Sequence, residues 1–153
     1  MTFFRYFATK EDVALADNYD PLIVELLQQT SPDLSLIERI GAALLEGLDQ
    51  IYDADRVTML GQMKLMVSTP VLRERLWANQ MATQQLILES LAGEGQRNRP
   101  TFESRVAVAA SLAAASTAVI TWVESDGKHE LPELIQQAFD ALSQPRRALD
   151  HAV

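Results

Sequence analysis

Apolar residues recur at helical spacing along almost the whole chain, and the glycines and prolines stand between the periodic segments rather than inside them. The strict alternation that predicts a half-buried strand is nearly absent. The pattern therefore predicts an all-α protein of six or seven helices.

Capping residues place the ends of these predicted helices. Ser35 and Glu38 have the spacing of a capping box, and Pro70 follows Thr69 as the first residue of a helix, where a missing N–H costs nothing. Thr9 and Thr101 are further N-cap residues, and Asp126-Gly127 ends a long helix. The predicted helices span residues 10–17, 21–29, 35–52, 53–68, 70–91, 101–125 and 131–143.

The last two predicted helices differ in kind. Residues 131–143 form one apolar stripe opposite a polar face, whereas residues 101–125 are apolar or small on every side. A domain of this size cannot cover such a helix completely, so we expect a partner subunit to do so. The prediction is a homodimer in which the two helices pair with their symmetry mates as a four-helix bundle. The expected interface residues are Val106, Ala110, Ala114, Ala118, Thr121, Leu134 and Ala138.

Residues 106–123 could also be considered as a membrane-spanning helix, because they carry no charge and nearly reach the length of a membrane span. Alanine, serine and threonine dominate the segment, and they contribute little to insertion compared with leucine or phenylalanine. A buried helix of a soluble protein is the favoured interpretation, and no membrane partner is expected.

Composition and charge narrow the function classes. The chain has 153 residues, of which 48% are hydrophobic, enough for one compact domain with a sizeable core. Its formal net charge of −8 has the wrong sign for an autonomous nucleic-acid binder or for a protein of anionic membranes. The absence of cysteine excludes disulfides and thiolate chemistry and fits a cytoplasmic location.

The sequence offers little to an enzyme. Neither His129 nor His151 has a histidine or carboxylate at ligand spacing on a helix, so no metal is expected. No phosphate-cradling loop, dinucleotide fingerprint or nucleophile motif is present, so no cofactor is expected either. Acidic pairs such as Asp53 with Asp55 lie at predicted helix ends, where capping explains them better than acid–base catalysis. We therefore predict that the chain is not an enzyme.

A cluster of methionines marks a candidate ligand pocket in the middle of the chain. All four internal methionines fall in two successive predicted helices, and the second helix also places tryptophan and glutamines on one face. Methionine adapts to varied ligands, tryptophan supplies contact area, and amides fix orientation. The alternative is core methionines with glutamines facing solvent. The predicted pocket residues are Met59, Met63, Met66, Trp77, Gln80, Met81 and Gln84.

Residues 2–13, Thr-Phe-Phe-Arg-Tyr-Phe-Ala-Thr-Lys-Glu-Asp-Val, resemble the end of the DNA-binding head in the TetR family of transcription regulators. In that family a recognition helix ends in threonine, aromatic residues and phenylalanine, and the next helix opens with Lys-Glu-Asp and an aliphatic residue. The resemblance implies that Thr2, Tyr6 and Lys10 contact DNA phosphates, with Phe4 and Arg5 at the groove. Phe3 and Phe7 are better explained as core residues that seat the head on the body.

The same resemblance implies a domain layout and a function. Residues 1–9 would be the remnant of a helix-turn-helix head, residues 10–145 a ligand-binding and dimerisation domain, and residues 146–153 a polar tail. Roughly forty residues of the head would be missing, so operator DNA would be bound only when the full head is present. The expected function is ligand-responsive transcription control, with repression favoured and a small hydrophobic effector as partner. The alternative is a helical protein–protein interaction module with no DNA or small-molecule function.

Overall fold

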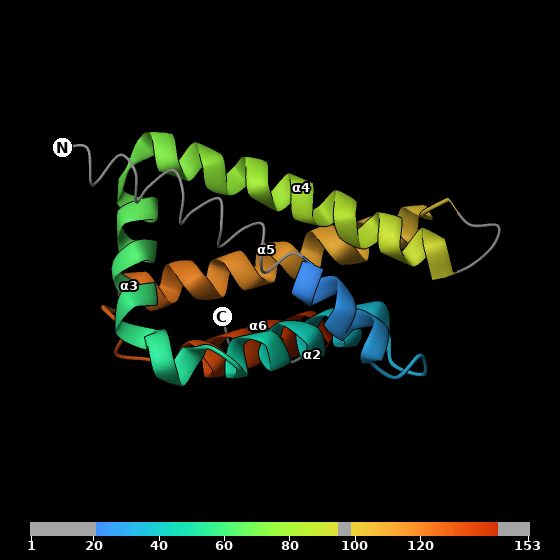
Figure 1. Cartoon of the computed structure of the whole chain (residues 1–153), viewed down its shortest axis with the longest axis horizontal. Coiled ribbons are helices and arrows are strands. Elements are labelled where there is room, and N and C mark those ends of the chain that lie inside the picture. Colours follow the sequence, from blue (N-terminus) through green and yellow to red (C-terminus); the bar gives the residue numbers. More distant parts are fainter. Residues whose placement is uncertain (1–20, 95–98, 144–153) are drawn as a thin grey trace, which may run out of the picture.

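The computed structural model describes residues 21–94 and 99–143, and within these ranges it holds helices and no strand (Figure 1). The all-α prediction is confirmed. Residues 21–29 are helical and are followed by five helices: α2 (Leu36–Asp49), α3 (Tyr52–Ser68), α4 (Pro70–Glu94), α5 (Phe102–Glu124) and α6 (Leu131–Ser143).

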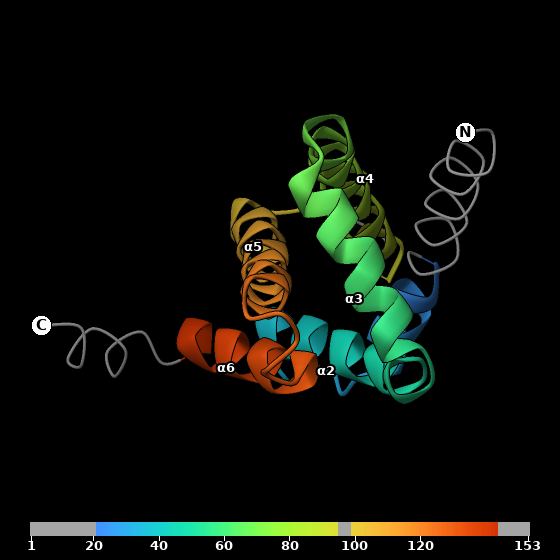
Figure 2. The same ribbon diagram turned by 90° about the vertical axis from the view of Figure 1, so that its left-hand side faces the viewer.

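The helices form two layers. Figure 2 shows α2 and α6 side by side in one layer, with α5 lying on it and with α3 and α4 next to α5. Helix α3 rises from the end of α2 to the start of α4, so it connects the two layers at one end of the molecule (Figure 1).

Local capping explains most helix starts. The Ser35 N–H donates to Glu38 Oε2 at 2.8 Å and the Glu38 N–H donates to Ser35 Oγ at 3.3 Å, which confirms the capping box. Thr101 Oγ1 accepts from the Ser104 N–H at 3.1 Å at the start of α5. Pro70 is the first residue of α4, as predicted.

Two predicted helix ends are wrong. Helix α2 ends at Asp49 rather than at residue 52, and Tyr52 opens α3 instead. The break occurs because Ile51 leaves the helical region, with φ −127° and ψ −23°, and no side chain caps the new helix. Helix α4 continues to Glu94, three residues beyond the predicted end.

The core lies where α5 meets the α2–α6 layer. Its largest fully buried side chain is Trp122, and α2 and α6 approach closely because Gly41 has no side chain. A Cβ atom at Gly41 would lie 2.8 Å from Phe139 Cδ1. The buried core residues are Leu26, Leu27, Ile40, Ala43, Leu48, Tyr52, Ile87, Leu88, Val108, Leu112, Ala118, Trp122, Leu131, Ile135 and Phe139.

Helix α5 is buried on one side and open on the other. Val108, Leu112 and Trp122 face the core, whereas Phe102, Val106 and Ile120 are 77%, 50% and 42% exposed. By length and composition α5 is long and apolar enough to cross a membrane. Of its most apolar 18-residue stretch, 28% is buried within the subunit. The subunit therefore leaves uncovered one side of this helix, which the sequence predicts to be apolar or small all round.

Candidate effector, coupling and dimerisation surfaces

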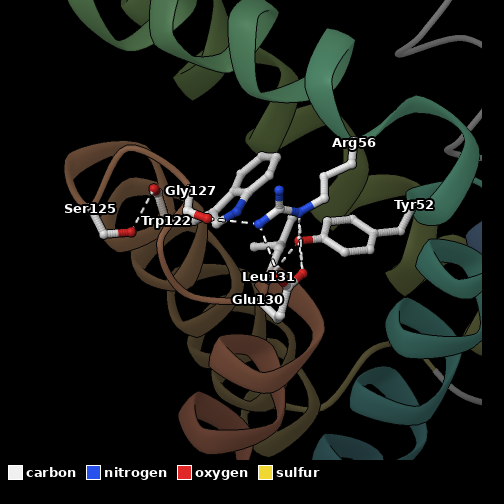
Figure 3. Close-up of polar contacts among 7 residues, drawn as sticks. All are labelled: Tyr52, Arg56, Trp122, Ser125, Gly127, Glu130 and Leu131. Carbon is white, nitrogen blue, oxygen red and sulfur yellow. Dashed lines mark hydrogen bonds and ion pairs between the residues drawn. The ribbon is translucent and has the colours of Figure 1, made fainter.

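The Tyr52 hydroxyl is the centre of a polar cluster between α3 and the start of α6 (Figure 3). It donates to Glu130 Oε2 at 2.6 Å and accepts from the backbone N–H of Leu131 at 3.2 Å. The Tyr52 ring is buried and lies against Trp122, with 5.9 Å between ring centroids. Through this one side chain the first residue of α3 contacts both α5 and α6.

Arg56, one turn further along α3, completes the cluster. Its Nε donates to the Tyr52 hydroxyl at 3.0 Å, and its Nη2 donates to the Gly127 carbonyl at 2.7 Å and to Glu130 Oε1 at 3.0 Å. A planar guanidinium suits this set of acceptors, because its N–H groups project in fixed directions.

The turn between α5 and α6 has a left-handed backbone that only certain residues tolerate. Asp126 and Gly127 have φ of 57° and 70°. A Cβ atom at Gly127 would lie 2.7 Å from Leu60 Cδ2, so α3 packs directly on the turn. One turn beyond Leu60, Lys64 forms an ion pair with Asp126.

Tyr52, Arg56, Leu60 and Lys64 thus occupy every fourth position of α3, and all four contact residues 126–131. We call these four residues the α3 contact stripe. Residues at this spacing lie on one face of a helix. The stripe therefore holds α3 along the whole α5–α6 turn.

Hydrogen bonds shift the acidity of the exposed groups in this region. The Tyr52 hydroxyl, followed by Arg56, lowers the pKa of the Glu130 carboxyl below its ordinary value. The hydrogen bond to Tyr52 raises the pKa of Arg56, and Lys64 lowers the pKa of Asp126. Each shift favours the charged form that makes the contact.

The predicted pocket residues are placed in different surroundings. Met59 and Met63 are half-buried against the core, and Met66 is buried. Gln80 and Gln84 are half-buried, and Gln80 Oε1 accepts from Ser116 Oγ of α5 at 3.0 Å. Trp77 and Met81 are 63% and 61% exposed, so they do not line an enclosed site within the described chain.

One open groove lies away from these residues, between α2 and α6. Its volume is about 330 Å³, and it is lined by Ala42, Leu45, Glu46, Asp49 and Pro132. None of the predicted pocket residues lines it.

The predicted interface residues also divide by exposure. Val106 and Thr121 are exposed, and Ala110, Ala114, Leu134 and Ala138 are half-buried. Ala118 is 3% exposed and belongs to the core of its own subunit, so it is not available to a partner. The exposed face of α5 instead carries Phe102, Val106, Ala113, Thr117 and Ile120.

The expected DNA-contacting residues, Thr2, Phe4, Arg5, Tyr6 and Lys10, lie outside the described residues. The α3 contact stripe, by contrast, is described in full and was not predicted. In the sequence, the stripe is marked by an aromatic, a basic, an apolar and a basic residue spaced four positions apart. This pattern distinguishes it from the neighbouring methionines.

A helical body of this kind, with a long two-faced helix before a short amphipathic one, fits the C-terminal domain of a TetR-type transcription regulator. The family model of the MftR C-terminal domain, a TetR-type domain, matches residues 34–147, about three quarters of the chain. The chain therefore belongs to the MftR C-terminal domain family, which comprises regulatory domains rather than enzymes. No curated protein and no solved structure matches the chain.

Proposed function

We propose that this chain is the effector-binding and dimerisation part of a cytoplasmic, ligand-responsive transcriptional repressor. The observation that carries the proposal is the family match over residues 34–147. An effector bound in the helical domain changes the separation of the two DNA-binding heads of the dimer. For this, the effector must bind the arrangements with different head separations with different affinity.

The dimer forms through α5 and α6. The exposed stripe of α5, with Val106, Ala113 and Ile120 along its length, meets the same stripe of a second subunit. Leu134 and Ala138 of α6 are half-buried and extend the apolar surface. An isologous pairing lets each surface cover its own copy, and an obligate interface of this type buries on the order of 2,000 Å² or more.

The effector binds where α3, α4 and α5 meet. Met59 and Met63 supply an adaptable apolar wall, and the hydrogen bond between Ser116 and Gln80 supplies polar groups that can exchange partners. Within the described ranges Ser111 is the one polar residue that is fully buried, so no buried cation or anion awaits a charged ligand. The effector is therefore a small, largely apolar molecule with a neutral hydrogen-bonding group.

A dye titration tests the effector site. The probe is Nile red, an uncharged dye whose fluorescence rises in apolar surroundings, and the variants are Met63→Ala and Met81→Ala. We expect Met63→Ala to weaken dye binding about tenfold, the equivalent of 1.4 kcal/mol, and the exposed Met81→Ala to leave it unchanged. Weaker binding in Met81→Ala alone would place the site on the outside of α4 instead.

DNA binding is tested with a longer form of the protein that carries two further helices ahead of Thr2. Fluorescence anisotropy at physiological salt should show a preference of about 10³-fold or more for its promoter over unrelated DNA. Lys10→Ala should weaken binding to all sequences alike, because a phosphate contact reads no bases. Binding without sequence preference would reject the regulator.

One observation favours the alternative of a protein-interaction module. Large apolar side chains are exposed on α3 and α4: Val57, Leu65, Val71, Trp77 and Met81. Scattered exposed apolar residues are common, but a continuous patch marks a contact surface. The promoter experiment separates the two functions, since an interaction module would not select DNA.

A further inference from the structure

The α3 contact stripe covers much more of α3 than a single capping interaction needs. From Tyr52 to Lys64 it extends about 18 Å along the helix axis. Over this length, the four stripe residues contact the segment from Asp126 to Leu131, which joins the two helices of the proposed dimer interface.

That segment is fixed to both helices by its own hydrogen bonds. At the α5 end, the Gly127 N–H donates to the Trp122 carbonyl at 3.0 Å. At the α6 end, the Leu134 N–H donates to the Glu130 carbonyl at 3.1 Å. Leu131 is the buried first residue of α6, and Glu130 precedes it directly. A displacement of the turn therefore carries the end of α5 and the start of α6 with it.

Helix α3 cannot slide along this turn by small steps. Leu60 Cδ2 occupies the position that a side chain at Gly127 would take, and Arg56 donates to two separate acceptors. A shift of α3 must break these contacts together, and packed surfaces of this kind change between discrete arrangements. The neighbouring side of α3 carries Met59 and Met63, which we assign to the effector site.

We propose that α3 and the dimerising helices change state together through the α3 contact stripe, so that subunit association and the effector-facing side of α3 are energetically linked. This inference rests on the proposed function. Linkage is reciprocal: whatever strengthens association holds α3 in place, and an effector that moves α3 alters association by the same factor.

Hydrogen exchange of the full chain, measured by mass spectrometry, tests the link. The dimer is compared with Ala113→Arg, a change on the exposed stripe of α5 that introduces a charge into the interface without touching the core. We expect α3 amides near Met63 to exchange roughly tenfold more slowly in the dimer, within the usual range of coupling between sites.

Two variants show whether the stripe carries this effect. Glu130→Gln removes the charge that Arg56 and Tyr52 contact, and Glu133→Gln makes the same change at an exposed position of α6. In the Glu130→Gln dimer, the slower exchange that dimerisation gives to the α3 amides should disappear. The slower exchange of the α5 amides should remain. Glu133→Gln should behave as the wild type. Arg56→Lys, which retains the charge but loses the fixed geometry, replaces Glu130→Gln if circular dichroism shows that variant to be unfolded.

The outcomes distinguish a failure of the proposed dimer from a failure of the link between α3 and the dimerising helices. A monomeric mass for the wild type at tens of micromolar would reject the proposed dimer and the link with it. A dimer whose α3 exchanges as fast as in Ala113→Arg, or whose Glu130→Gln form keeps the protection, would overturn the link and leave the dimer intact.

Discussion

Ser111 shows how one buried hydroxyl differs from its neighbours on the same helix. It is fully buried, and its Oγ has no hydrogen-bond partner among the described residues. Thr117 and Thr121 donate their hydroxyls to the carbonyls four residues earlier. A buried hydroxyl without a partner keeps its desolvation cost, so Ser111 weakens the core that surrounds it.

We expect Ser111→Ala to stabilise the protein by about 1 kcal/mol, because it removes an unpaired buried group. Urea unfolding at neutral pH measures the difference. Ser68→Ala is the control, since its hydroxyl is exposed, donates to the Leu65 carbonyl and lies away from the proposed interface, and it should change the stability little. A loss of stability in Ser111→Ala would mean that the hydroxyl has a partner in solution.

Tyr52→Phe tests the polar cluster. It leaves the buried N–H of Leu131 without an acceptor, which costs about 1–3 kcal/mol. The cost should depend on pH, because the Tyr52 hydroxyl is the main cause of the lowered pKa of Glu130. A carboxyl whose pKa is lowered on folding contributes stability above its ordinary pKa, 4.5 for this group, and loses it as the pH falls through the folded value.

The difference in unfolding free energy between wild type and Tyr52→Phe should therefore be full at pH 7 and shrink as the pH falls below about 4.5. Urea titrations at several pH values check this. In a Glu130→Gln background the same comparison should no longer vary with pH in this range. A difference that grows in acid would contradict the assignment of Tyr52 to Glu130.

At the scale of elements, the spacing between α2 and α6 depends on Gly41. Glycine ordinarily weakens a helix, so an alanine at an open helical position would add roughly 1 kcal/mol of stability. At Gly41 a methyl group would overlap the ring of Phe139, which is buried and cannot turn aside.

Gly41→Ala should therefore destabilise the protein by about 1–3 kcal/mol, the usual cost of overpacking. Gly61→Ala is the matched control, because nothing lies within 4 Å of a Cβ atom there, and it should be neutral or stabilising. Thermal unfolding of both variants measures the contrast. Phe139→Leu should recover part of the loss in the Gly41→Ala background.

Element boundaries could be predicted where the signal is local. The Ser35–Glu38 box and the Thr101 cap each involve residues three positions apart, and both are in the structure as expected. The break before Tyr52 has no capping side chain, so the sequence predicts two separate helices there but places the end of the first at residue 52 instead of Asp49.

The candidate site was harder to predict because its contacts are distant in sequence. Arg56 and Glu130 are 74 residues apart, and no periodicity indicates that they meet. The spacing of Trp77 and Met81 places them on one face of α4, but spacing alone does not tell whether that face is covered. Both are exposed in the described chain, whereas Met59 and Met63 are half-buried against the core.

At the scale of the whole molecule, the exposed stripe of α5 predicts the oligomeric state. Light scattering of the full chain should give the mass of a dimer, and Ala113→Arg should give a monomer, because a buried arginine without a partner is costly. Ala78→Arg, on the exposed side of α4, is the control and should remain dimeric. We choose Ala113 over Ala114, because Ala114 packs against the core of its own subunit. A dimeric Ala113→Arg protein would place the interface elsewhere.

The proposed dimer would also tie the lifetime of the protein to its abundance, because a lone subunit leaves one face of α5 open. A subunit that has not met its mate presents Val106 and Ile120 to water and to the proteases and chaperones of the cell. Pairing is a matter of mass action, so the covered fraction rises with the number of copies. A weakly expressed gene would thus lose newly made subunits to degradation before they pair, and the amount of dimer would rise more steeply than the rate of synthesis.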